Sequence, residues 1–326
     1  MRVGSNARLL AVGLVGIFSC AVSSLAGAQN PTRVRVISVP VITSAPLQIA
    51  IQKGFFADEK LDIQASFIPG GAIALPTVIA GQADIVMSSI VTTILADQQG
   101  LGLQIVAPAG TSNTQPPDAA ALVAKSGSGF RSGKDLEGKR LAVNTRNNIL
   151  WLYARAWIEK TGGDATKVTF LEVPVPQMID AIQGGRVDAA FVIEPFLAAE
   201  QTDRVAVIAY PYFDVQGGGI PNSQFVALKT YIAANSDTIE RFSRAYNRGV
   251  DWLNERRGTD EWIDALAKYT KMSPDLVRKL PASPFVKSVE PIAVNEIVKL
   301  MKKHGMLNAG YEPKDLIYRT AIPNAP

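Results

Sequence analysis

Short apolar strands alternate with amphipathic helices in two separate runs of the chain, and this alternation limits the fold more than any other feature. In the first run we expect strands at 34–39, 63–67, 84–87 and 103–107, with helices at 47–51, 72–80 and 91–99. In the second run we expect strands at 140–143, 168–173 and 187–193, with helices at 148–160 and 178–183. Repeated strand–helix units of this size predict an α/β fold of mostly parallel sheets, each flanked by helices.

A short repeated pattern indicates that the two runs are equivalent. Gly81-Gln82-Ala83-Asp84 ends one predicted helix and precedes a buried strand, and Gly185-Arg186-Val187-Asp188 does the same in the second run. The glycine is suited to the end of a helix, and the aspartate is a polar residue before an apolar strand. The two aspartates lie 104 residues apart, which is about the length of one lobe. We therefore expect two lobes of similar construction.

The last third of the chain is predicted to be almost entirely helical after a strand at 224–228. Apolar residues recur there at helical spacing in three stripes, and we expect each stripe to face the core. The stripes are Ile239, Phe242, Ala245, Tyr246, Val250 and Leu253, then Trp262, Leu266 and Tyr269, and then Ile292, Ile297, Leu300 and Met301.

The first 28 residues have the features of an export signal. Arg2 and Arg8 precede an apolar run at 9–22, and Ala26-Gly27-Ala28 offers small residues for cleavage after Ala28. The run is shorter than the roughly 20 residues that a membrane-spanning helix needs. Cleavage would leave 298 residues in the periplasm. Lipid attachment at Cys20 is a less favoured alternative, because the bulky Phe18 fits a lipoprotein box poorly.

Charge and reactive side chains exclude several classes of function. The net charge of +4 falls to +2 without the signal segment, so neither nucleic acid nor an anionic membrane is expected as a partner. Cys20 is the only cysteine in the sequence, and the only histidine, His304, stands beside two lysines and is predicted to be a solvated surface residue. Thiol chemistry, Ser–His–Asp catalysis and most zinc sites therefore lack their components, and we expect no metal and no cofactor.

Several motifs together resemble the solute-binding proteins of the sulfonate, nitrate, taurine and thiamine-precursor ABC importers. They are Ala45-Pro46-Leu47-Gln48-Ile49-Ala50-Ile51-Gln52-Lys53-Gly54-Phe55-Phe56, Pro69-Gly70-Gly71, Lys134-Asp135-Leu136-Glu137-Gly138-Lys139 and Glu194-Pro195-Phe196. The resemblance implies a two-lobed type II periplasmic binding protein fold with a ligand cleft between the lobes. Residues 29–122 and 226–326 would form lobe one, and residues 123–225 would form lobe two. The chain would cross between the lobes near Leu122–Val123 and Phe225–Val226.

Candidate ligand-binding residues are placed where predicted strands turn into helices. Open α/β sheets bind ligands at these turns, and helix N-termini there attract anions. The small or polar residues at the turns are Ser44, Gln48, Gly70, Gly71, Ala72, Ser88, Ser89, Asn144, Thr145, Asn147 and Asn148. Each of these turns is equally consistent with ordinary capping of a helix.

Four single residues are further candidates for the site. Arg146 has a planar fork that suits carboxylate, sulfonate or phosphate, although an exposed arginine is the plainer interpretation. Trp151 is suited to stacking on a flat ligand or to filling the core. Glu194 is suited to holding an amino group or to capping the helix after Pro195. Gly218, in a run of three glycines, favours either mobility or a close approach to ligand.

These observations predict a monomeric, non-enzymatic protein that captures a small organic anion by closing its lobes and delivers it to a membrane permease. Two alternatives stay open at this point. One is an enzyme of pyrimidine or chorismate-derived metabolism on the same fold, and the other is a ligand-sensing partner of a membrane receptor.

Overall fold

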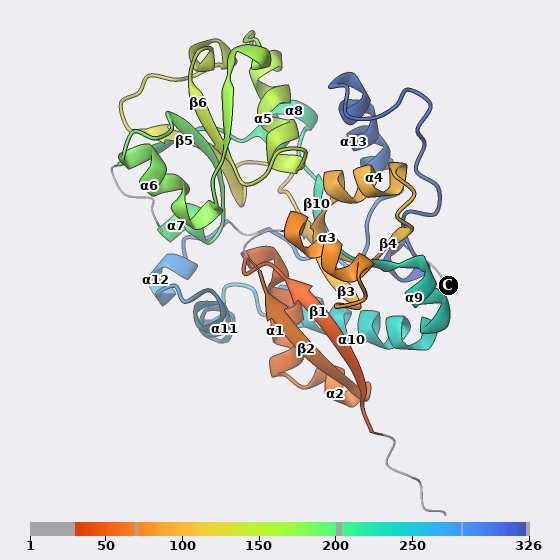
Figure 1. Cartoon of the computed structure of the whole chain (residues 1–326). Helices are drawn as coiled ribbons and strands as arrows, with labels where there is room; N and C mark the ends of the chain where they lie inside the picture. The colour runs from red at the N-terminus through yellow and green to blue at the C-terminus, as the bar shows by residue number, and fades with distance from the viewer. Residues whose placement is uncertain (1–29, 69–70, 200–203, 282, 324–326) are drawn as a thin grey trace, which may run out of the picture. The chain divides into compact units, whose positions relative to one another are not determined.

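The computed structural model describes residues 30–68, 71–199, 204–281 and 283–323, and their helices and strands all belong to one unit, Pro31–Pro326. Two five-stranded sheets form its framework, in the orders β2-β1-β3-β10-β4 and β7-β6-β8-β5-β9 (Figure 1). The strands of the first sheet are β1 (Thr32–Ser38), β2 (Leu61–Phe67), β3 (Ile85–Ser89), β4 (Leu103–Thr111) and β10 (Pro221–Leu228). The strands of the second sheet are β5 (Ala120–Lys125), β6 (Arg140–Val143), β7 (Thr169–Glu172), β8 (Ala189–Ile193) and β9 (Val205–Ala209).

Each sheet is parallel except for one strand, which confirms the predicted α/β architecture. In the first sheet β1 runs parallel to β2 and β3, whereas β10 is antiparallel to β3 and β4. In the second sheet β6 runs parallel to β7 and β8, whereas β5 is antiparallel to β8 and β9. The reversed strand is fourth in both orders. In both sheets it is also the strand with which the chain arrives from the other sheet.

The chain passes between the sheets in two short segments, 112–119 before β5 and 217–220 before β10. The predicted crossings at Leu122–Val123 and Phe225–Val226 lie inside β5 and β10 and were therefore several residues too late. Apart from the buried Gln224 of β10, both strands are apolar along their buried length, so the sequence carries no local signal for the sheet with which they pair. Hydrogen-bonding partners that are distant in sequence decide this point.

Both faces of the first sheet are covered by helices, and the side chains of each strand alternate between the two faces. Ile85 and Met87 belong to a buried cluster with α1 (Ala45–Gln52), α2 (Phe55–Asp58) and α10 (Ser236–Glu255). Val86, between them, belongs to the opposite cluster with α3 (Gly71–Ile79), α4 (Ile90–Gln98) and α13 (Pro291–Lys303). Burial on both faces explains why these strands are apolar throughout.

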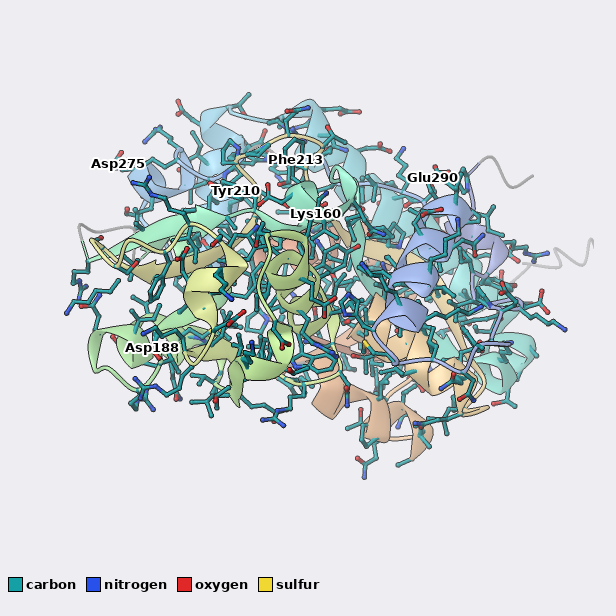
Figure 2. The ribbon with its side chains drawn as sticks, turned by 90° about the horizontal axis from the view of Figure 1, so that it is seen from above. Lys160, Asp188, Tyr210, Phe213, Asp275 and Glu290 are labelled. Carbon is teal, nitrogen blue, oxygen red and sulfur yellow. The ribbon has the colours of Figure 1, made fainter. Side chains whose placement is uncertain are left out.

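The second sheet repeats this arrangement. Leu122 and Phe191 pack toward α5 (Ile149–Lys160) and α8 (Pro211–Gln216), whereas Ala121 and Val192 pack toward α6 (Met178–Gln183) and α7 (Phe196–Ala199). Figure 2 shows Lys160, at the end of α5, in the same region as Phe213 of α8. The Nζ atom of Lys160 donates a hydrogen bond of 3.2 Å to the carbonyl of Val215, which ties these two helices together.

The remaining helices agree with the predicted C-terminal region, with two exceptions. The remaining helices are α9 (Lys229–Ala234), α11 (Asp260–Thr270) and α12 (Pro274–Val277). Short 3-10 turns along the whole chain are found at Ile42–Ser44, Gly133–Leu136, Ala165–Lys167, Val175–Gln177 and Arg319–Ala321. The stripe on α10 is buried as predicted, and so are Trp262 and Leu266 of α11. Ile292 was predicted to face the core but is 71% exposed in the first turn of α13.

The second exception is His304, which is buried and not solvated as the sequence suggested. Its side chain is 1% exposed, and its Nδ1 atom lies 3.3 Å from the Oε1 atom of Glu159 on α5. Successive residues at a helix end project about 100° apart. His304 is thus turned toward α5 although its neighbours Lys302 and Lys303 are more exposed.

Candidate functional site

A cavity of about 350 Å³ is lined by residues of both sheets. In the first sheet they lie at the carboxyl ends of β1, β2 and β3 and at the start of β10, and in the second at the carboxyl ends of β6, β7 and β8 and the start of β5. Because β5 and β10 are antiparallel to their neighbours, their starts lie at the same edge as the carboxyl ends. This is the edge at which open α/β sheets bind ligands.

Apolar side chains make up much of both cavity walls, and the two acidic residues lie only on the wall of the second sheet. The lining residues associated with the first sheet are Val39, Pro40, Val41, Ile42, Thr43, Phe67, Ile68, Met87, Ser88, Ser89, Thr92, Asn222 and Ser223. Those associated with the second sheet are Asp118, Ala119, Ala120, Asn144, Asn148, Ile149, Leu150, Val175, Pro176, Ile193, Glu194, Phe196 and Tyr212.

Neutral hydrogen-bonding groups follow the strands on both walls, and several of them also cap helices. The Ser89 hydroxyl accepts a hydrogen bond of 3.5 Å from the backbone N–H of Thr92 at the start of α4. The Oδ1 atom of Asn148 accepts a bond of 3.0 Å from Leu150 at the start of α5, and its Nδ2 atom donates to Asn144 Oδ1 at 2.7 Å. Ser89 and Asn148 therefore cap helices and line the cavity at the same time, so a capping role does not exclude contact with a ligand.

Among the described lining residues, Asp118 carries the one buried side-chain oxygen or nitrogen atom without a hydrogen-bond partner. Its side chain lies in the crossing segment before β5 and the residue is 2% exposed. The Oδ1 atom accepts hydrogen bonds from the backbone N–H groups of Asn113 (3.2 Å) and Ala119 (2.7 Å). The Oδ2 atom is buried and has no hydrogen-bond partner within the described part of the chain. Burial raises the pKa of Asp118 to about 6, against the smaller opposing effect of the two backbone donors.

Glu194 is the second buried acid of the cavity and is also 2% exposed. Its Oε2 atom accepts a hydrogen bond of 2.8 Å from the backbone N–H of Ala198, so it does cap α7. Burial raises the pKa of Glu194 to about 7. Its own backbone N–H donates to the carbonyl of Ala119 at 2.9 Å, which continues the β5–β8 ladder and brings the residue beside the segment that carries Asp118.

The described lining residues include no lysine, arginine or histidine. Among the described lining residues, two buried acidic residues thus stand in an apolar wall without a lysine, arginine or histidine to compensate them. Burying a carboxylate without a partner is unfavourable, which is the physical reason that both pKa values are raised.

Five predicted site residues line the cavity: Ser88, Ser89, Asn144, Asn148 and Glu194. They lie at the end of a parallel strand or in the turn that follows it, at the edge that the fold argument singled out. That ligand contacts any of them remains a prediction.

Arg146 and Trp151 lie elsewhere, so the predicted anchoring of an anion in the cleft by Arg146 does not agree with its position. The exposed Arg146 donates from Nη2 to the carbonyl of Phe170 at 2.7 Å. Trp151 meets the Phe170 ring edge-on at 6.1 Å and carries the guanidinium of Arg155 over its own ring at 4.5 Å. Arg146, Trp151 and Arg155 line a separate surface depression. The order of residues in a loop does not specify the direction in which a long side chain projects.

Four further candidates are not among the lining residues. The buried Ser44 donates to the carbonyls of Val39 (2.6 Å) and Val41 (2.8 Å), and so fixes a segment that does line the cavity. Gln48 is half-buried on α1 and Thr145 is half-buried after β6. Asn147 is exposed, with a φ of 57°.

The glycines have other roles than the predicted ones, where they can be described. Gly218 has a φ of +78°, and a Cβ atom added to it would lie 2.0 Å from the carbonyl oxygen of Asn113. It therefore permits the two crossing segments to approach each other, and not the approach of ligand that was predicted. Gly71 and Ala72 begin α3, and Gly70 lies outside the described residues.

Sequence reasoning missed Asp118, Thr43, Asn222, Ser223 and Tyr212. Thr43 follows a strand and was within reach of the argument used for the other turns. Asp118, Asn222 and Ser223 lie at the starts of antiparallel strands, and the prediction from sequence considered only the carboxyl ends of strands. Tyr212 reaches the cavity from α8, and its position depends on packing against Tyr153 and Phe191.

Two classes of feature are absent from the described residues. No group of three or more His, Cys, Asp or Glu side chains that could hold a metal ion occurs among them. None of the helices described is both long enough and apolar enough to cross a membrane. The predicted signal segment and Cys20 lie outside the described residues.

Comparisons with known proteins agree with this geometry. The model of the family described as NMT1/THI5 like matches residues 42–256. A protein of Bacillus subtilis (strain 168) named as a binding protein, YtlA, is 23% identical over 253 residues, which cover 76% of this chain and 74% of that protein. The alkanesulfonate-binding protein SsuA of Xanthomonas axonopodis pv. citri, solved with MOPS bound, superposes with a TM-score of 0.71 at 19% identity, covering 89% of this chain and 99% of that one. The ligand-binding component of an ABC-type import system of Staphylococcus aureus, solved with zinc bound, gives a TM-score of 0.75 at 16% identity, covering 90% and 99%.

Proposed function

Because the chain belongs to the NMT1/THI5-like family, we propose that it is the substrate-binding component of an ABC importer, which captures a small molecule and delivers it to a membrane permease. The observation that carries the proposal is the cavity lined by the corresponding edges of both sheets. A ligand held in this cavity contacts residues of two different sheets at once. Its binding energy is then available to favour the arrangement in which both sheets contact it.

The volume and lining limit what the cavity accepts. About 350 Å³ suits a small organic molecule, and apolar side chains make up much of the wall. An organic anion, as predicted from the sequence and as bound by the alkanesulfonate-binding protein, would be held by neutral donors alone. The described lining residues that offer such donors are Thr43, Ser88, Ser89, Thr92, Asn144, Asn148, Tyr212, Asn222 and Ser223.

Capture without chemical conversion is part of the proposal. Asp118 and Glu194 are the only described lining residues with a pKa near neutral pH, and no described lining residue has a thiol or an imidazole. Nucleophilic catalysis requires a nucleophile beside a base, and none of the described hydroxyl groups in the cavity has an imidazole partner. Export by the segment 1–28, action in the periplasm and a monomeric state belong to the same proposal.

The proposal is tested with the exported protein and a collection of small sulfonates, carboxylates, amines and neutral compounds. A ligand present at 100 times its dissociation constant adds about 2.7 kcal/mol to the free energy of unfolding, which is readily seen as a rise in melting temperature. We expect small-angle scattering to show compaction with the compounds that stabilise the protein. Mass spectrometry should recover these compounds unchanged, and an altered compound would contradict the non-enzymatic part of the proposal.

A further inference from the structure

The ionisable side chains of the described cavity wall include carboxyl groups but no basic group. Asp118 and Glu194 both line the cavity and are both 2% exposed, and no described lining residue is a lysine, arginine or histidine. In a family whose characterised neighbours include a sulfonate-binding protein, such a wall is unexpected, because an anion would lie against two carboxyl groups.

Asp118 carries the strongest evidence. Its Oδ1 atom is satisfied by two backbone donors, Asn113 and Ala119, which fix the orientation of the carboxyl plane. Its Oδ2 atom is buried without a hydrogen-bond partner in the described residues. Unpaired buried acceptors are rare in folded proteins, and the residue that carries this one lines the cavity, so a ligand donor is the partner that this oxygen lacks.

Glu194 supplies a second carboxyl group from the neighbouring strand end. Its backbone N–H binds the carbonyl of Ala119, the residue next to Asp118, at 2.9 Å. The acids therefore come from adjacent segments of the same sheet edge. Ile149 and Leu150 line the same cavity, so a ligand in it is surrounded by two acidic residues and by apolar side chains.

We infer that the group recognised in this cavity is a cationic nitrogen, a protonated amine or amidine on an apolar body, with its N–H groups donating to Asp118 Oδ2 and to the carboxyl group of Glu194. The inference rests on the proposed function, because it takes the cavity to be a ligand site. Hydrogen bonds between ionised partners are stronger than neutral ones, and a cation also neutralises the buried carboxylates.

Protonation equilibria agree with this assignment. Burial raises the pKa of both acids, to about 6 for Asp118 and about 7 for Glu194, and a bound cation favours their ionised forms. The other titratable groups that interact with them are Tyr210 and Tyr212, whose pKa values are raised above 10 by burial, so both phenols stay neutral near pH 7. An anion would require the acids to be protonated, and its binding would weaken as the pH rises.

The test uses two sets of matched probes, each with one apolar body and three head groups. They are benzylamine, benzyl alcohol and phenylmethanesulfonate, and butylamine, butanol and butanesulfonate. In titration calorimetry at pH 7.5 we expect an amine to bind at least about tenfold more tightly than its matched alcohol or sulfonate. Its affinity should rise between pH 5.5 and 8.

Variants locate the effect in the cavity. Asp118→Asn keeps an oxygen that accepts from Asn113 and Ala119 but removes the charge, and it should lower amine affinity at least about tenfold with little change for the alcohol. Glu194→Gln provides a second variant should Asp118→Asn fold poorly, which a melting curve detects. Asp180→Asn is the matched control, since Asp180 is an exposed residue of α6 outside the cavity lining.

The outcomes separate this inference from the proposed function. Tighter binding of either sulfonate than of its amine overturns the cationic ligand and leaves the importer function intact. Equal loss of amine and alcohol affinity in Asp118→Asn also overturns it, because the residue would then only shape the cavity. If none of the six probes binds to the parent protein at millimolar concentration, the cavity is not a small-molecule site and both proposals fail.

Discussion

Arg140 and Asp188 are joined by three hydrogen bonds, in which the carboxylate accepts from the backbone N–H (2.8 Å), Nε (3.1 Å) and Nη2 (3.0 Å) of the arginine. Arg35 and Asp84 repeat all three contacts in the first sheet, at 2.8, 3.1 and 2.5 Å. Each pair ties the second strand in the order of its sheet, β6 or β1, to the residue just before the next parallel strand, β8 or β3. The structural equivalence of the two sheets therefore extends to individual side chains.

The two aspartates should differ in their contribution to stability. The Asp84 side chain is 9% exposed and that of Asp188 is 30% exposed, so solvent screens the second pair more strongly. We expect Asp84→Asn to lower the free energy of unfolding by about 1.5–3 kcal/mol and Asp188→Asn to lower it less. Denaturant unfolding of both variants measures the difference, and a larger loss for Asp188→Asn would contradict the burial argument.

Gly218→Ala should destabilise the protein far more than Gly217→Ala. Both glycines have positive φ values, +80° for Gly217 and +78° for Gly218, but only the second would place a Cβ atom against the Asn113 carbonyl. The left-handed backbone alone costs about 1 kcal/mol for alanine, and we expect the clash to bring the loss at Gly218 above about 3 kcal/mol. Melting curves of the two variants test this, and similar losses would show that the crossing segments readjust.

Asp118 should make the ligand-free protein less stable as the pH rises. Its pKa is raised on folding, so its stabilising protonation is fully present below the unfolded pKa of about 4 and is lost as the pH rises through about 6. The free energy of unfolding of Asp118→Asn should therefore rise relative to that of the parent protein between pH 5 and pH 8, by about 1.4 kcal/mol, which corresponds to the one pH unit between pH 5 and the folded pKa of about 6. Thermal unfolding across this range measures the difference. A constant difference between the two proteins would show that Asp118 has an ordinary pKa.

His304 should make the protein sensitive to acid. Burial lowers the pKa of its imidazole, while Glu159 acts in the opposite direction. A lowered pKa means that the stability is present above the unfolded pKa of about 6.5 and is lost as the pH falls below it. The parent protein should thus lose more stability than His304→Gln between pH 7 and pH 5. If the parent instead becomes relatively more stable on acidification, the ion pair with Glu159 outweighs burial.

Arg146→Ala should leave ligand affinity unchanged within about threefold, because the side chain binds the Phe170 carbonyl and lines a separate depression. Ser88→Ala, in the cavity, should cost an ordinary hydrogen bond of about 0.5–1.5 kcal/mol if the ligand bonds to it. Calorimetry with the most stabilising compound of the screen compares the two variants. A tenfold loss for Arg146→Ala would restore the role predicted from the sequence.

The sequence alone determined the parallel strands β1, β2, β3, β6, β7 and β8 and the α/β layering, whereas β5, β9 and α8 were not predicted. The predicted strand 140–143 and helix 178–183 coincide with β6 and α6, and the paired motifs ending in Asp84 and Asp188 indicated the equivalence of the two sheets. These features depend on local periodicity and on residues at element ends, which a linear pattern contains. The turns carrying Ser88 and Asn148 followed from the same reasoning, because the carboxyl ends of parallel strands share one edge.

Only the tertiary structure decided which side chains line the cavity and what charge they bring. Arg146 and Asn148 are two residues apart in one loop, yet one lines a surface depression and the other the cavity. Asp118 precedes a strand whose antiparallel orientation depends on hydrogen bonds to β8 and β9, far away in sequence. The direction of a side chain and the burial of a carboxyl group result from packing between distant segments, and for that reason the acidic character of this cavity could not be predicted from the order of the residues.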